Sequence, residues 1–283
     1  MNTTFIVEDG FNTSYIDSIL MALFYRTSHL QEILIQLPKK SKFVYLQDII
    51  NNNFIEQVRR NVSVDITIIN EIRNYSFICG WKENLNITEL YNVVDYLDFL
   101  IEGFDIGEIK CELLEISKNL QENIKSFYTN YIEIKVTDDN DIKTLLNKCI
   151  DINFNKKNNS TLTYYHFSEL PLFVPIYLNR YDDNNQINNY KIDIKKKIRF
   201  NNNNNKLQSD ASWIIHAIVC FSNSGNRHYY TIISTLDNKW CIFSNNKIPS
   251  LMKIDITDTV IANKIKQECV LILYRLDDNM CAI

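Results

Sequence analysis

A short, mostly apolar segment near the start of the chain must be buried, whatever surrounds it. Between Ser14 and Tyr25 nearly every residue is apolar, so a helix formed here would be hydrophobic on almost all sides. Such a helix is stable only inside the protein. Asn12, Thr13 and Ser14 stand at its start, and these residue types are preferred as helix N-caps. The segment therefore predicts a polar cap followed by a buried helix over residues 14–25.

The composition is that of a folded protein with a sizeable core. Of the 283 residues, 46% are hydrophobic and 12% are aromatic, which argues against general disorder. A chain of this length forms one large domain or two modest ones. The formal net charge of -4 argues against a nucleic-acid partner, because proteins that bind nucleic acid concentrate positive charge. A mildly acidic protein suits a basic protein surface better.

The sequence indicates an intracellular, cytoplasmic protein. No segment approaches the roughly 18 apolar residues of a membrane span, and residues 1–4 lack the basic start of a secretion signal. The 7 cysteines are odd in number and form no C-x-x-C pair, so we expect neither a disulfide framework nor a cysteine zinc site. Frequent Asn, Ile, Lys and Tyr indicate an AT-rich genome, as in many large DNA viruses and some protists. For a viral protein the location would be the host cytoplasm.

The first part of the chain has helical patterns and the second part has strand patterns. We expect helices near 14–25, 29–36, 43–59, 64–73, 88–103 and 141–150. Short alternating or apolar segments predict strands at 131–136, 171–178, 190–200, 212–222, 227–234, 239–243 and 267–275. Helices followed by short strands favour an α+β protein with an antiparallel sheet. The polar segments 155–160 and 201–205 are expected to be exposed loops.

A nucleophile at residue 14 would lie at the N-terminus of the buried helix. That end of a helix carries a partial positive charge, which stabilises a negatively charged side chain. The alternative is an ordinary capped helix, in which Ser14 has no chemical role. From this segment alone both interpretations stay open.

Among the four histidines, His228 is the best placed to act as a base. It follows a turn that contains Gly225 and begins an expected strand, and such loop ends often carry functional residues. A surface or packed histidine is the alternative. His216 lies inside an apolar strand, where we expect a structural role. The strand that starts at Trp240 ends in polar residues, which could orient an imidazole or form an ordinary turn.

Five segments that carry these features follow one another in a distinctive order: residues 9–21, 93–100, 170–181, 213–231 and 240–245. They are a capped apolar helix, an acidic helix, a strand that begins Leu-Pro, a histidine hairpin and a strand that begins with Trp. This order resembles the ubiquitin-specific protease family, papain-like peptidases that remove ubiquitin. The family's first motif, N-x-G-N-T-C-Y-x-N-S-x-L-Q, is similar to the first segment.

The resemblance implies an α+β fold of the papain-like cysteine protease type, with a helical thumb, an antiparallel palm sheet and reduced fingers. It covers most of the chain. It implies a single catalytic domain over residues 1–283, with a helical lobe over about 1–125 and a sheet lobe over about 126–283.

The resemblance places Ser14 at the position of the nucleophilic cysteine, with His228 as the base and Asn245 or Ser244 as the residue that orients it. A cysteine has a pKa of about 8.5, which helix-end and imidazole charges lower. A serine hydroxyl instead needs a general base during attack, so we expect a large loss of activity. Asp9 stands where family members hold an asparagine for the oxyanion, and an ionised aspartate can only accept hydrogen bonds.

The resemblance also implies a protein partner. Asp95 matches a family aspartate that pairs with an arginine of the ubiquitin tail, although a solvated helix-face carboxylate is the alternative. Tyr229 is a second expected substrate-binding residue. Of the cysteines that bind zinc in the family's fingers only Cys111 is retained, so we expect no metal and no cofactor. The expected protein is a monomer that binds ubiquitin or a ubiquitin-like protein, and neither nucleic acid nor a membrane.

Three hypotheses follow for the function. In the first, the chain is a deubiquitinase-type thiol hydrolase that cleaves (iso)peptide bonds after the terminal glycine of ubiquitin, and Ser14 is an introduced, inactivating change. In the second, it is a natural pseudo-peptidase that binds ubiquitin without cleavage, as the departures at Asp9 and Ser244 favour. In the third, it is an unrelated structural or interaction protein.

Overall fold

The computed structural model describes most of the chain: residues 5–28, 36, 38, 40–82, 89–106, 109–116, 122–150, 162–167, 171–199, 211–235 and 239–277. For 110–116, 122–127, 147–150 and 162–167 it describes the backbone alone. The chain forms two compact units, which comprise Met1–Ile106 with His216–Leu271 and Gly107–Ile215 with Ile272–Ile283. Most of the helix expected near 29–36 and both expected loops, at 155–160 and 201–205, lie outside the described residues.

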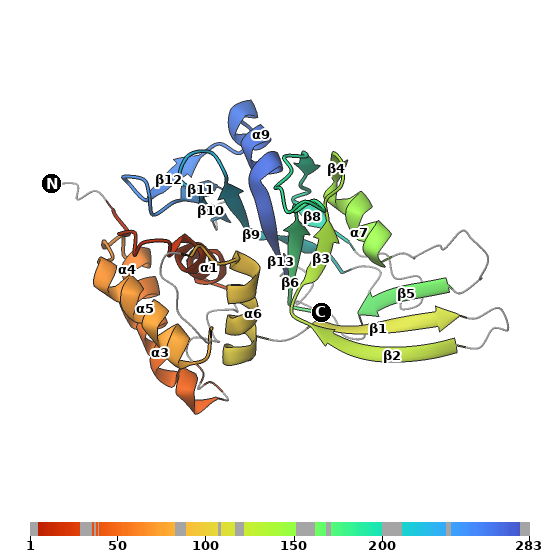
Figure 1. Ribbon diagram of the computed structural model, residues 1–283, viewed down its shortest axis with the longest axis horizontal. Helices are drawn as coiled ribbons and strands as arrows, with labels where there is room; N and C mark the ends of the chain where they lie inside the picture. Colours follow the sequence, from red (N-terminus) through yellow and green to blue (C-terminus); the bar gives the residue numbers. More distant parts are fainter. Residues whose placement is uncertain are drawn as a thin grey trace. The chain divides into compact units, whose positions relative to one another are not determined.

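The first unit contains the helices expected in the first part of the chain (Figure 1). They are α1 (Ser14–Phe24), α3 (Val44–Asp48), α4 (Glu56–Arg59), α5 (Ile66–Ile78) and α6 (Val93–Phe104). A 3-10 turn (Ser41–Phe43) leads into α3, and a π-helical segment (Ile49–Ile55) joins α3 to α4, so the stretch is helical without a break. The helix expected over 43–59 is therefore confirmed, although its winding changes along its length.

The expected start of the helix at Thr88 is wrong. Helix α6 begins at Val93, and residues 89–92 are not helical. The N-cap is Asn92. Its extended backbone (ψ 132°) keeps the helix from continuing toward the N-terminus, and its side chain accepts a hydrogen bond from the backbone N–H of Val94 at 3.1 Å. An asparagine in this position satisfies a backbone N–H that would otherwise lack a partner.

Helix α1 is the central helix of the first unit, and the prediction of its burial is confirmed. All of its residues are buried. It packs against α6 on one side and against β10 (His228–Ser234) on another. Thr231 on β10 donates a hydrogen bond of 2.8 Å to the carbonyl oxygen of Ser18. Since apolar side chains surround the helix, several elements must cover it.

The strands of this unit form an antiparallel array in the order β12-β11-β10-β9. They are β9 (Trp213–Ser222), β10, β11 (Trp240–Phe243) and β12 (Leu251–Ile254). Thr231 is paired with Val219 on one side and with Phe243 on the other. Helix α9 (Thr259–Glu268), which the sequence analysis did not predict, follows β12 and is capped by Asp258.

The N-terminal segment of this unit links two of its elements. Val7 forms a parallel bridge with Val64, next to the start of α5. The backbone N–H of Val7 also donates to the hydroxyl of Ser250 at 2.9 Å, and the N–H of Ser250 donates to the carbonyl of Phe5 at 3.0 Å. This segment therefore fixes the position from which the chain enters α1.

The second unit contains a three-stranded antiparallel sheet in the order β2-β1-β5. Its strands are β1 (Ile109–Ile116), β2 (Glu122–Thr129) and β5 (Leu162–Phe167). The strands thus begin at residue 109, before the lobe boundary expected near residue 126. The expected division into two lobes stays a prediction, and in the first compact unit α1 packs on β10, so that unit contains both helices and strands.

The other strands of this unit include a parallel pair, β3 (Ile132–Lys135) and β6 (Phe173–Asn179). Helix α7 (Ile142–Ile150) is confirmed, and β13 spans Cys269–Leu276. The strand expected over 190–200 is wrong in length. That segment contains only β7 (Ile192–Asp193), which pairs with β4 (Asn140–Asp141), and β8 (Lys197–Ile198).

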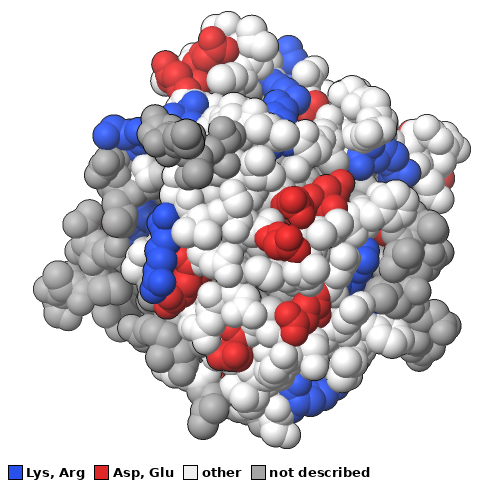
Figure 2. Space-filling view, turned by 90° about the vertical axis from the view of Figure 1, so that its left-hand side faces the viewer, with Lys and Arg blue, Asp and Glu red and all other residues white. Residues whose placement is uncertain are grey.

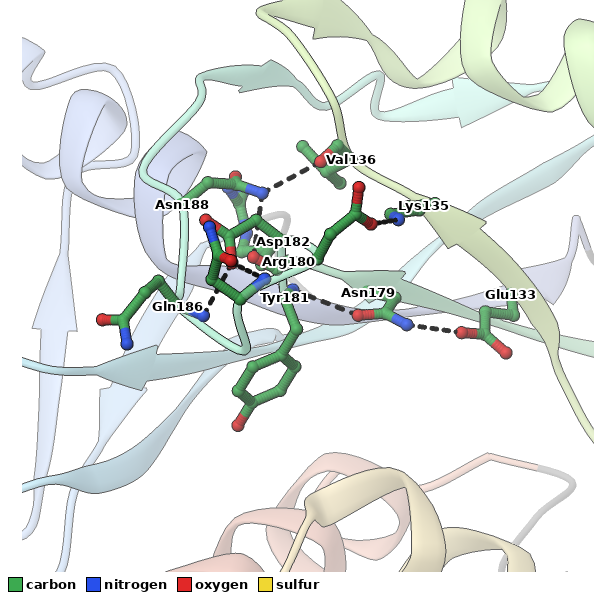
Figure 3. A network of polar contacts seen from close by, with 11 residues as sticks. Glu133, Lys135, Val136, Asn179, Arg180, Tyr181, Asp182, Gln186 and Asn188 are labelled. Carbon is green, nitrogen blue, oxygen red and sulfur yellow. Dashed lines mark hydrogen bonds and ion pairs between the residues drawn. The ribbon is translucent and has the colours of Figure 1, made fainter.

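A polar network holds the turn after β6 (Figure 3). Asn179 donates to the carboxylate of Glu133 at 2.7 Å, and Lys135 is 2.6 Å from the carboxylate of Asp183. The amide of Asn188 donates to two backbone carbonyls, at 2.9 Å and 2.8 Å. These contacts stay within the unit and connect β3 to the end of β6. Among all described residues, no helix is long and apolar enough to cross a membrane.

Candidate active site

The chain makes a left-handed turn immediately before α1. Phe11 and Asn12 have φ angles of 61° and 57°, and this region is strained for a bulky residue such as phenylalanine. Arg73 on α5 holds the turn, because its guanidinium donates to the carbonyl of Phe11 at 3.0 Å. Strained backbone of this kind is found most often at functional sites.

The expected polar cap of α1 takes a different form. Thr13 is the N-cap residue, yet its side chain makes no capping hydrogen bond to the helix. Its hydroxyl instead accepts from Gly10 N at 3.1 Å and lies 3.3 Å from Asp17 Oδ2 and 3.5 Å from Asp9 Oδ1. The backbone at Thr13 is not extended (φ -90°, ψ 0°), as it would be in an ordinary N-cap. The hydroxyl faces the carboxylates of Asp9 and Asp17 and does not cap the helix.

Ser14 is the first residue of α1 and lies against the start of the histidine-bearing strand. Its hydroxyl oxygen accepts a hydrogen bond of 3.0 Å from the backbone N–H of Tyr229. Ser14 is only 4% exposed, and Tyr229 is buried too. Residues 14 and 228, which are far apart in the sequence, are therefore brought to neighbouring positions. Because Tyr229 follows His228, the contact places residue 14 beside the start of β10, where His228 lies.

His228 begins β10 and is only partly buried. Its Nδ1 lies 2.8 Å from the carbonyl oxygen of Asn226. Because a carbonyl can only accept, Nδ1 carries the proton in this contact, and Nε2 is the acceptor of the neutral ring. No hydrogen bond joins His228 to Ser14 among the described residues. The backbone of the preceding turn, and not a side chain, orients the imidazole.

Neither of the two expected orienting residues contacts His228 in the described structure. Ser244 donates to the side-chain oxygen of Asn246 at 2.6 Å. Asn245, which is buried, donates through Nδ2 to Asp17 Oδ2 at 2.6 Å and to Asp9 Oδ1 at 3.4 Å. The roles assigned to these two residues stay predictions.

Asp17 is a polar member of this site that the sequence analysis missed. It lies in the first turn of α1, is fully buried, and its Oδ1 has no hydrogen-bond partner. Burial raises the pKa of Asp17 well above its ordinary value, and the neighbouring charge of Asp9 raises it further. Hydrogen bonds from Asn245 and Thr13 oppose that shift. A carboxylate within an otherwise apolar, buried helix was the signal in the sequence.

Asp9 is exposed and lies next to this buried group. Its carboxylate is near the Asn245 amide and the Thr13 hydroxyl, both of which donate. An ionised carboxylate adds only acceptors here. An ionised Asp9 therefore supplies no hydrogen-bond donor for a negatively charged oxygen, and at the predicted oxyanion position it would not stabilise that oxygen.

Asp95 lies in the first turn of α6 with 47% of its side chain exposed. Lys82 Nζ is 3.4 Å from its carboxylate and also lies over the ring of Trp81, 4.6 Å from the centroid. Trp81 packs with Tyr15 of α1, whose pKa burial raises to about 12. A buried aromatic cluster thus connects the residue after Ser14 to the surface that carries Asp95.

No metal centre is found among the residues that the structure describes, where no three His, Cys, Asp or Glu side chains are grouped to hold an ion. Cys111 lies on β1, in the part of the chain described by its backbone alone. The segment around 153–165, where family members hold the second cysteine pair of their fingers, falls partly outside the described residues. The expectation of an absent zinc therefore stays a prediction.

Comparisons with known proteins bear on the fold. No family model and no curated protein matches the sequence. Two of the solved structures that are similar to the chain are of the SAGA DUB module of Ubp8, Sgf11, Sus1 and Sgf73. The one bound to monoubiquitin has a TM-score of 0.67 at 12% identity, and the one bound to ubiquitin aldehyde has a TM-score of 0.64 at 14% identity. Each match covers 97% of this chain and 69% of the other chain.

The chain therefore has a mixed fold of helices and a mostly antiparallel sheet, similar to that of the Ubp8 deubiquitinase. This agrees with the expected combination of helices and an antiparallel sheet, whereas the papain-like thumb, palm and fingers stay a prediction. At such low identity the likeness concerns the fold, and the chemistry has to be argued from this chain's own residues.

Proposed function

We propose that this chain is a ubiquitin-specific-protease-like domain that binds ubiquitin or a ubiquitin-like protein, with the tail of its partner directed to the start of α1. The observation that carries the proposal is the hydrogen bond between Ser14 Oγ and the N–H of Tyr229. It brings the N-terminus of a buried helix to the residue that follows a histidine. Hydrolysis by a helix-end nucleophile and an imidazole base needs the two side chains close to each other, and this contact supports their being so. The likeness to two ubiquitin-bound structures supports the same partner.

The reaction of such a site is cleavage of an (iso)peptide bond after the terminal glycine of the tail. Residue 14 would attack the carbonyl, His228 would take its proton, and the same imidazole would then protonate the leaving amine. Ser14 is a poor nucleophile for this step, because its hydroxyl does not ionise near neutral pH. Removal of an essential member of a catalytic triad costs several orders of magnitude in rate.

The contacts around the site favour a binding protein without cleavage. His228 is oriented by Asn226, while Ser244 and Asn245 are engaged by Asn246 and Asp17. Among the residues that the structure describes, no third side chain is hydrogen-bonded to His228 to stabilise the imidazolium that attack would form. The version in which Ser14 alone inactivates a protease leaves these other contacts unexplained. A natural pseudo-peptidase therefore accounts for more of the site.

The surface charge is consistent with this partner. Figure 2 shows one face of the molecule, on which acidic side chains form several small groups separated by neutral residues. With a formal net charge of -4, the protein is suited to a partner with basic residues near its point of contact. A monomeric, cytoplasmic protein and a viral or protist origin stay proposals that rest on sequence composition.

Binding and reaction can be tested separately. Titration of the protein with ubiquitin in a calorimeter should give saturable binding, and an Asp95→Arg variant should weaken it by about tenfold or more through charge repulsion. A ubiquitin with an electrophilic C-terminus should leave the protein unlabelled and should label a Ser14→Cys variant slowly. Absence of ubiquitin binding together with absence of labelling in both proteins would overturn the proposal and favour an unrelated interaction protein.

A further inference from the structure

Asp17 and Asn245 are joined by a short hydrogen bond. The two side chains are buried, and the distance between Asn245 Nδ2 and Asp17 Oδ2 is 2.6 Å. This is the shortest of the contacts that Asn245 makes, because its other carboxylate partner, Asp9, is at 3.4 Å. Hydrogen bonds from an amide to a buried carboxylate are strong, since water does not compete for either group.

The same site holds the residues on which catalysis would depend. Asp17 and Ser14 are three positions apart, so they lie on the same face of the first turn of α1. Phe243, at the end of β11, pairs with Thr231 of β10. The chain leaving β11 therefore reaches Asn245 close to the start of β10, where His228 lies. Asn245 thus follows the strand that pairs with β10, and its amide is hydrogen-bonded to Asp17 on α1.

We propose that Asp17 is a positioning residue that holds Asn245 on α1 and thereby keeps its amide from orienting His228. The inference rests on the proposed function, and it gives a structural reason why the site would bind its partner without cleaving it. Two changes, and not one, then separate this chain from an active thiol hydrolase. A cysteine at residue 14 would meet a histidine that is hydrogen-bonded to the backbone of Asn226, while the Nδ2 of Asn245 is hydrogen-bonded to Asp17.

The inference predicts an interaction between positions 17 and 245 that can be measured in the Ser14→Cys protein. The reaction followed is alkylation of the new thiol by chloroacetamide, in which the thiolate displaces chloride. Asp17→Ala removes the acceptor that holds Asn245, and the alkylation rate at neutral pH should rise about tenfold or more, as expected for a base that gains an orienting partner. Asn245→Ala, added to Asp17→Ala, should cancel that gain.

A conservative variant separates position from charge. Asp17→Asn retains an oxygen that accepts from Asn245 but removes the charge, so the alkylation rate should stay within about twofold of the parent rate. An electrostatic effect of the carboxylate on the thiol would instead change the rate in Asp17→Asn as much as in Asp17→Ala. The pH profile of alkylation should shift to lower pH in Asp17→Ala alone, which a merely structural role would not produce.

The outcome does not depend on ubiquitin. Chloroacetamide is small, so loss of ubiquitin binding would leave this experiment intact and would count against the proposed function only. Thermal melting of each variant reports folding, and Asp17→Ser, whose hydroxyl is too short to reach Asn245, replaces Asp17→Ala if that variant does not fold. Equal rates with and without Asn245 in the Asp17→Ala and Asp17→Ser proteins would overturn the inference.

Discussion

The hydroxyl oxygen of Ser14 accepts a hydrogen bond of 3.0 Å from the backbone N–H of Tyr229. Both groups are buried, so the N–H has no access to water as a substitute. A hydroxyl at the first residue of a helix is therefore used to satisfy the backbone of a strand. The contact ties α1 to the start of β10 and has a structural value that is independent of any chemistry.

Ser14→Ala should destabilise the protein by about 1–3 kcal/mol, because it leaves the N–H of Tyr229 buried without an acceptor. Ser18 is the matched control. It lies one turn further along α1, is equally buried, and its hydroxyl has no hydrogen-bond partner. Ser18→Ala should be neutral or slightly stabilising. Unfolding in urea gives both values, and equal effects of the two substitutions would contradict the role assigned to Ser14.

The stability of the protein should depend on pH through Asp17. Burial and the nearby Asp9 raise the pKa of Asp17 above 3.8, although Arg73 opposes the shift. Between the ordinary and the raised pKa the folded state binds the proton more tightly than the unfolded state. The free energy of unfolding therefore falls as pH rises through that range. Asp17→Asn should remove this loss, so its advantage over the parent protein should be small near pH 3.8 and larger at neutral pH.

Asp65 supplies a control of the opposite sign. Hydrogen bonds from the side chain and backbone of Thr67 lower the pKa of Asp65, which caps α5. Its charged form stabilises the fold at neutral pH, and that contribution is lost as pH falls. Urea unfolding of Asp65→Asn at a series of pH values should show its disadvantage disappearing in acid. The same pH slope for both variants would contradict the assignment at Asp17.

Lys82 should compete with the partner for Asp95. The Lys82–Asp95 pair is partly exposed, and such pairs contribute up to about 1 kcal/mol. Lys82→Gln should therefore raise the affinity for ubiquitin by up to about fivefold, because it leaves Asp95 available to a basic residue. Lys135→Gln removes a lysine from an ion pair with Asp183 in the second unit and should leave the affinity unchanged. Calorimetric titration measures both, and weaker binding by Lys82→Gln would contradict the role of Asp95.

Asn61 ends α4 in a left-handed conformation, with φ at 59°. Its N–H bonds to the carbonyl of Val58 at 3.0 Å, and the N–H of Val62 bonds to that of Gln57 at 2.9 Å. This pair of bonds is the Schellman motif, in which glycine is preferred at the left-handed position. Asn61→Gly should stabilise the protein by up to about 1 kcal/mol, and Asn61→Val should destabilise it by about 1–2 kcal/mol. The two midpoints of thermal unfolding should move in opposite directions.

The sequence was informative where local pattern and burial coincide. The apolar segment after Ser14 predicted a buried helix, and the apolar strands around His216 and His228 predicted β9 and β10. The order of motifs indicated a fold similar to that of a deubiquitinase. These features depend on residues that are close together along the chain, so a local sequence pattern can predict them.

The missed features depend on contacts between distant residues. The engagement of Asn245 by Asp17 spans 228 positions, and no local pattern encodes it. The strands β1 and β2 have mixed composition and are defined by their pairing. The start of α6 was placed too early, because the helical spacing of apolar residues does not show where Asn92 caps the helix.

The hydrogen bond between Val7 and Ser250 has a consequence for how the protein folds during synthesis. The contacts at the site join residues separated by 215, 228 and 243 positions. During synthesis, α1 is made more than 200 residues before the β10 contact and the Asn245 segment that cover it. The apolar helix therefore stays exposed until the strands that pack on it have been synthesised. Contacts between residues so far apart in the sequence also form slowly, because they close long loops. A product truncated before residue 228 would lack β10, which packs on this helix, and should aggregate or be degraded.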